Sequence, residues 1–154
     1  MVRSIKLTTD QMRLISLFQN ITKATARDCL DDEEQDKIIF VVSEGKMGLA
    51  IGKGGSNIKS LQNILKRNVE LIEYFDDPIK FLKNIFNPKY VNEVKLDKKP
   101  DGSSVATIIV DHGKKGLVVG REGRNAQKAR LFAKRYFDIS NVLINSPQVA
   151  QLEM

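Results

Sequence analysis

Two short segments of this 154-residue chain combine glycine with basic side chains in a pattern that suits anion binding. The first is Gly52-Lys53-Gly54-Gly55, and the second is Gly120-Arg121-Glu122-Gly123. Each lies between an apolar stretch and a segment with helical periodicity. Glycine lets a ligand approach the backbone closely, and free amides at the start of a helix point toward a bound anion. We expect both loops to bind phosphate, either of a nucleotide or of a nucleic acid.

The spacing of the glycines argues against a nucleotide site. A P-loop requires the pattern G-x-x-x-x-G-K-[ST], whereas Gly48 and Gly52 enclose three residues and Lys53 is followed by glycine. The dinucleotide-binding pattern G-x-G-x-x-G is absent from both loops. The sequence therefore favours the phosphates of a nucleic-acid backbone.

A purely structural role is the alternative, because glycine adopts a left-handed backbone at little cost and would allow a tight turn between helices. That role needs no ligand. It does not explain why both loops contain a basic residue, Lys53 and Arg121, or why Lys59, Arg124 and Lys128 follow on the next predicted helix.

The two loops belong to an internal repeat. A shift of 68 positions places Gly120 on Gly52, Gly123 on Gly55 and Asn125 on Asn57 without a gap. Further identities at the same shift are Val42, Gly45, Lys46, Gly48, Leu49, Lys66 and Arg67 with their counterparts. We predict two copies of one unit over 1–76 and 77–146, followed by a C-terminal tail over 147–154.

Each copy shows the same order of predicted elements. In the first, Thr8 precedes an amphipathic helix, strands follow at 29–30 and 37–43, a short apolar helix leads into the loop, and a helix and a strand at 69–75 follow it. In the second, Pro78 opens a helix, and strands at 91–96 and 105–110, the loop, a helix over 124–136 and a strand at 142–144 follow. The predicted fold class is α+β, with the order α-β-β-α-α-β and a three-stranded sheet covered by helices on one face in each unit.

The loop sequences resemble a known RNA-binding motif. "IGKGGSNI" at 51–58 and "VGREGRNA" at 119–126 match the pattern of KH domains, in which an apolar residue precedes G-x-x-G and another apolar residue follows. Because each unit begins with a helix, the resemblance is to type II KH domains. Two such domains in tandem, covering nearly the whole chain, resemble the archaeal NusA-like transcription factors.

This resemblance implies binding of single-stranded, nascent RNA and an effect on elongation, pausing or termination by RNA polymerase. The residues it assigns to RNA binding, together with the neighbouring cations, are Gly52, Lys53, Gly54, Gly55, Lys59, Gly120, Arg121, Glu122, Gly123, Arg124 and Lys128. Glu122 departs from the pattern of the first loop, because it places a carboxylate where phosphate should bind. Two alternatives stay open: a ribosome-associated or ribosome-assembly KH protein, and a KH-fold module that binds protein.

Composition sets the outer limits of function. The formal net charge is +6, residues 1–76 contain equal numbers of basic and acidic side chains, and the excess of positive charge therefore lies in 77–154. Five acids crowd into residues 31–36, which we interpret as a solvated hairpin tip. An apolar content of 42% is enough for a packed core, and no apolar run is long enough to span a membrane. We expect a cytoplasmic protein.

Catalytic chemistry has little support in the sequence. The single histidine, His112, is interpreted as a turn residue, and the single cysteine, Cys29, as a core residue. One cysteine excludes an internal disulfide and a cluster built on several thiolates. We expect no catalytic residues, no metal site and no cofactor.

Overall fold

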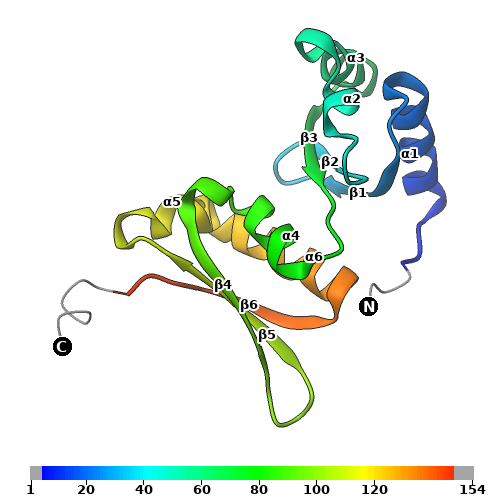
Figure 1. Cartoon of the computed structure of the whole chain (residues 1–154). Helices are drawn as coiled ribbons and strands as arrows, with labels where there is room; N and C mark the ends of the chain where they lie inside the picture. Colours follow the sequence, from blue (N-terminus) through cyan, green and yellow to red (C-terminus); the bar gives the residue numbers. More distant parts are fainter. Residues whose placement is uncertain (1–4, 148–154) are drawn as a thin grey trace. The chain divides into compact units, whose positions relative to one another are not determined.

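The structure, a computed structural model, describes residues 5–147 (Figure 1). The chain divides into two compact units, one comprising Lys6–Phe75 and the other containing the chain from Asp76 onward. Each unit has its own three-stranded sheet. Apart from Pro147, the predicted tail over 147–154 lies outside the described residues.

Both units have the predicted order of elements. The first contains α1 (Thr9–Thr22), β1 (Ala26–Asp32), β2 (Lys37–Val42), α2 (Met47–Ile51), the 3₁₀ turn η1 (Lys53–Gly55), α3 (Ser56–Leu65) and β3 (Asn68–Glu73). The second contains α4 (Pro78–Ile85), η2 (Pro88–Tyr90), β4 (Val91–Lys98), β5 (Ser104–Val110), η3 (His112–Lys114), α5 (Lys115–Val119), η4 (Arg121–Gly123), α6 (Arg124–Phe137) and β6 (Ile139–Asn145). The α+β class and the order α-β-β-α-α-β are confirmed. The 3₁₀ turns were not predicted, because a three-residue turn leaves no periodicity in a sequence.

The two sheets have the same mixed topology. In the first, β2 pairs with β1 in antiparallel orientation and with β3 in parallel orientation. In the second, β5 pairs with β4 and β6 in the same two ways. Parallel neighbours cannot be joined by a tight hairpin, so a crossover of two helices connects them. The glycine loop lies in the middle of that crossover, between α2 and α3 in the first unit and between α5 and α6 in the second.

The predicted cap of the first helix is present. The amide of Gln11 donates to Thr8 Oγ1 at 3.1 Å, and the amide of Thr8 donates to Gln11 Oε1 at 2.9 Å, which is a complete capping box. Gln11 also donates through Nε2 to the carbonyl of Cys29 at 2.9 Å. The start of α1 is therefore fixed to β1 as well as capped.

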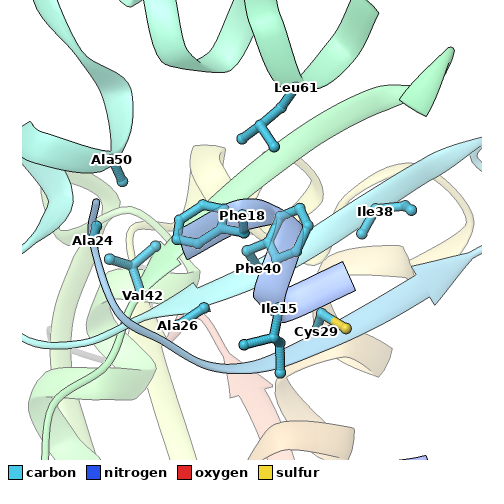
Figure 2. Packing of buried hydrophobic residues seen from close by; sticks show 10 residues of the cluster. All are labelled: Ile15, Phe18, Ala24, Ala26, Cys29, Ile38, Phe40, Val42, Ala50 and Leu61. Atoms are coloured by element: carbon cyan, nitrogen blue, oxygen red, sulfur yellow. The ribbon is translucent and has the colours of Figure 1, made fainter. Parts of the chain in front are cut away.

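The core of the first unit lies between the sheet and its helices. Alternate residues of β2, Ile38, Phe40 and Val42, belong to one buried cluster with residues of α1, α2, α3 and β1. Figure 2 shows the Phe18 ring of α1 beside the Phe40 ring, with Leu61 pointing toward them from α3. The two rings stack with their centroids 4.6 Å apart. The period of two along β2 thus places one strand face against the helices that flank the loop.

The second unit has a more aromatic core. Phe81 of α4 contacts Phe132, Tyr136 and Phe137 of α6 with ring centroids 5.6 to 6.3 Å apart. Phe132 and Tyr136 are buried, whereas Phe137 at the helix end is half-buried. At the position matching Leu61 stands Ala129, which is also fully buried. The two repeats therefore fill equivalent interiors with different side chains.

The acidic run lies at the tip of the β1–β2 hairpin and is mostly exposed, as interpreted, but part of it is paired with a basic side chain. Arg67, just before β3, lies 2.6 Å from Asp31 and 3.2 Å from Asp36, and its guanidinium also donates to the carbonyls of Asp32 and Lys37. The hydrogen bond and charge of Asp31 raise the pKa of Arg67 above its ordinary value. Part of the acidic run is therefore neutralised within the fold and holds the β1–β2 hairpin against the end of the crossover.

We predict that Leu61→Ala lowers the free energy of unfolding by about 2–5 kcal/mol, because it removes a fully buried side chain and leaves a cavity beside Phe18 and Phe40. Ile64→Ala on the same helix is the control, since Ile64 is 55% exposed and its truncation should cost less than about 1 kcal/mol. Urea denaturation followed by circular dichroism measures both variants. Equal destabilisation of the two variants would show that α3 does not pack as described.

Candidate nucleic-acid interface

The two glycine loops have nearly the same backbone. Gly52 has φ 77° and ψ 166°, and its counterpart Gly120 has φ 84° and ψ 167°. The two positions that follow the basic residue are left-handed in both loops, with φ between 58° and 76° at Gly54, Gly55, Glu122 and Gly123. A backbone of this kind is costly for residues with a Cβ atom, which explains the glycines in both copies.

Each loop leaves two consecutive amides unused. In the first, the amides of Gly52 and Gly55 donate to the carbonyls of Gly48 at 3.0 Å and Gly52 at 3.1 Å. The amides of Lys53 and Gly54 donate to no backbone carbonyl of the described chain. The second loop repeats this arrangement and leaves the amides of Arg121 and Glu122 without a backbone acceptor within residues 5–147. Consecutive free amides in a turn form a concave site for an anion.

Basic side chains accompany the amides differently in the two units. Lys53 and Arg121 occupy matched positions and are exposed. Lys59 lies exposed on α3, whereas the second unit has Arg124 and Lys128 on α6, and none of these three matches a cation of the other copy. Lys66 does not join this group, because α3 ends at Leu65 and Lys66 lies beyond it in a left-handed conformation (φ 58°).

Glu122 occupies the left-handed position that glycine occupies in the first loop. Its φ is 58°, and its carboxylate Oε2 lies 3.3 Å from Nη2 of Arg124. The Glu122 side chain is 70% exposed and that of Arg124 is 32% exposed. The Glu122 carboxylate therefore already occupies one hydrogen-bond donor of Arg124, and a phosphate that bound this donor would have to displace it.

Apolar side chains lie exposed immediately before each loop. Leu49 and Ile51 of α2 are 48% and 36% exposed, and Leu117 of α5 is 56% exposed. Exposed leucines at matched positions offer an aliphatic surface on which unstacked bases can rest. The predicted site residues of each unit thus lie on one segment that runs from the short helix through the loop to the next helix.

One pair of site residues was missed by the sequence analysis. The Asn57 side chain donates through Nδ2 to the carbonyl of Leu49 at 2.9 Å, across the base of the first loop. A Cβ atom on Gly52 would lie 2.9 Å from Cγ of Asn57, and one on Gly120 would lie 3.0 Å from Cγ of Asn125. The identity of Asn57 and Asn125 in the repeat was the available signal, and only the structure shows what they touch.

The remaining candidate residues take structural positions. His112 lies exposed in the turn η3, as expected, and Cys29 is buried in the core of the first unit. Within residues 5–147, no group of three or more histidine, cysteine, aspartate or glutamate side chains is placed to hold a metal ion. No helix in the same range has the length and apolar character needed to cross a membrane.

Comparisons with known proteins agree with this geometry. A family model described as KH domain matches residues 13–76. A Halobacterium salinarum protein named "Probable transcription termination protein NusA" is 37% identical over 139 residues, which cover 90% of this chain and 97% of the relative. A Methanococcus vannielii protein of the same name is 37% identical over 140 residues, which cover 91% of this chain and 79% of the relative.

A solved structure extends the agreement to three dimensions. The crystal structure of APE1850 has 37% sequence identity and a TM-score of 0.79, and the match covers 90% of this chain and all of that one. Bacillus subtilis "Transcription termination/antitermination protein NusA" is more distant, with 25% identity over 96 residues that cover 25% of its length. Sequence, fold and loop geometry lead to the same conclusion: the chain belongs to the archaeal NusA family of tandem KH proteins.

Proposed function

We propose that this protein binds single-stranded RNA through its two glycine loops and thereby regulates transcription elongation or termination. The observation that carries the proposal is the pair of consecutive free amides in each loop, beside Lys53 or Arg121, in one backbone geometry that occurs twice. Two domains, over 1–76 and 77–146, would each bind a short stretch of the strand.

The chemistry favours a single strand over a duplex. The phosphate binds the free amides and the nearby cation, while bases lie on the exposed aliphatic surface of Leu49 or Leu117. In a duplex the bases are stacked and paired, so they cannot reach that surface. The net charge of +6 adds a nonspecific attraction that salt screens.

The biological setting follows from the relatives. Two relatives at 37% identity, matched over 97% and 79% of their own length, are named as probable transcription termination proteins, and nascent RNA emerging from RNA polymerase is single-stranded. We infer that the RNA bound here is nascent transcript, that RNA polymerase is the protein partner, and that the protein acts in the cytoplasm by binding rather than by catalysis. Co-sedimentation of the protein with ribosomes instead of polymerase would favour the ribosome-associated alternative.

We predict that Lys53→Asp combined with Gly54→Asp weakens single-stranded RNA binding about 10- to 100-fold, because it removes a charged hydrogen bond and places carboxylates beside the phosphate. The fold should persist, since the added Cβ at Gly54 meets no atom within 4 Å and Glu122 shows that the matched position accepts a side chain. Fluorescence anisotropy with a labelled oligonucleotide, at several salt concentrations, measures affinity and slope. The salt slope should become shallower by about 0.7 for each phosphate that the variant no longer neutralises.

The matched control is Arg13→Asp combined with Ser16→Asp on the exposed face of α1, which changes the net charge by the same amount. It should retain most of the affinity. Equal weakening by the two double variants would mean that overall charge, rather than the first loop, governs RNA binding.

A reciprocal exchange tests Glu122. We predict that Gly54→Glu weakens RNA binding and that Glu122→Gly strengthens it, both more strongly at low salt, because a carboxylate near a bound phosphate is repulsive and salt screens the repulsion. Glu122→Gln separates charge from backbone, since it removes the charge and retains a side chain at the left-handed position. The same anisotropy titrations measure all three variants.

The folded state should change little in the glutamine variant, because an exposed ion pair such as that of Glu122 with Arg124 contributes about 0–1 kcal/mol. If neither Glu122→Gly nor Glu122→Gln tightens binding at low salt, the carboxylate does not oppose RNA and serves instead to orient Arg124.

A further inference from the structure

The first glycine of each loop, where a positive φ already favours glycine, also lies in close contact with a side chain of the next helix. A Cβ on Gly52 would lie 2.9 Å from Cγ and Nδ2 of Asn57 and from Oγ of Ser56, a distance that real Cβ contacts essentially never show. On Gly120 the matched atoms of Asn125 would lie at 3.0 Å, and its backbone nitrogen at 3.1 Å. The asparagine side chain therefore lies against the first glycine in both units, together with Ser56 in the first unit.

The other loop positions have no such neighbour. A Cβ at Gly54, Gly55 or Gly123 would meet no atom within 4 Å. These glycines are explained by their left-handed backbone alone. The contact with asparagine is thus specific to Gly52 and Gly120, the residues that directly follow α2 and α5.

The asparagine also satisfies a backbone group at the end of the short helix. The last carbonyls of a helix have no partner within it, and α2 has only five residues. Asn57 Nδ2 donates to the carbonyl of Leu49 at 2.9 Å, while the amide of Gly52 closes the final turn on Gly48 at 3.0 Å. Asn57 lies in the first turn of α3, so its side chain joins the helix before the loop to the helix after it.

The residues held together enclose the free amides. The bonded residues Leu49 and Asn57 lie on either side of Lys53 and Gly54 in the chain. The amides of Lys53 and Gly54 have no backbone acceptor in the described chain. We propose that Asn57 is a positioning residue that holds these amides in the geometry that receives RNA phosphate. This role rests on the RNA-binding function proposed for the two loops. Asn57 acts through the loop and does not contact the RNA.

Asn57→Leu tests the role, because leucine has the same branched arrangement of four side-chain heavy atoms and suits a helix but cannot donate a hydrogen bond. Asn63→Leu is the matched control, an exposed asparagine on the same helix. We expect Asn57→Leu to weaken binding of a single-stranded oligonucleotide about fivefold, the equivalent of one ordinary hydrogen bond, and Asn63→Leu to leave it unchanged. Because the variant keeps every cation, its salt slope should equal that of the wild-type chain, unlike the slope of Lys53→Asp/Gly54→Asp.

Amide hydrogen exchange in the protein without RNA provides the readout that separates positioning from contact. Asn57→Leu should speed exchange of the hydrogen-bonded Gly52 and Gly55 amides of the loop, while exchange in β2 stays protected. Weakened RNA binding with unchanged loop exchange would overturn the positioning role in favour of direct contact, and unchanged binding would overturn it outright. If the wild-type chain binds no single-stranded RNA, the proposed function itself fails, whereas normal wild-type binding with an unaffected Asn57→Leu variant refutes only this inference.

Discussion

The parallel pairing of β2 with β3, and of β5 with β6, is the constraint on which the rest of each unit depends. When consecutive strands are parallel, the first ends at the edge of the sheet opposite to the one where the second begins. The chain must therefore cross one face of the sheet before the second strand can pair. Here the return consists of two helices, and the glycine loop is the turn between them. The helices bury their apolar faces on the sheet, which leaves the loop and its amides exposed to a ligand.

The duplication separates what the fold requires from what the ligand requires. Backbone geometry is shared between the loops to within a few degrees, and the asparagine that follows each loop is the same residue. The interiors are not shared: Leu61 lies among Phe18 and Phe40 in one copy, whereas Phe81, Phe132 and Tyr136 fill the other. A hydrophobic core tolerates different side chains when a smaller residue at one position is compensated by a larger neighbour. An anion site made of backbone amides depends instead on the directions in which those amides point.

Charge is the feature that distinguishes the two loops. Both have a basic residue at the second position, but the first loop continues with Gly54 and the second with Glu122. Glu122 holds a left-handed backbone and pairs with Arg124, so the second loop carries its own anion beside the free amides. The two loops therefore share one backbone shape but differ in their electrostatics.

The sequence by itself determined the α+β class, the order of elements, the repeat, the family and the two loops, because these depend on local periodicity, turn residues and matched spacing. Only the tertiary structure decided which groups meet. The bonds of Arg67 to the acidic hairpin, the pairing of Glu122 with Arg124 and the contact of Asn57 with Leu49 and Gly52 all depend on where a side chain points after the chain has turned. Spacing along a chain does not specify those directions, since they follow from backbone angles that a sequence pattern leaves open.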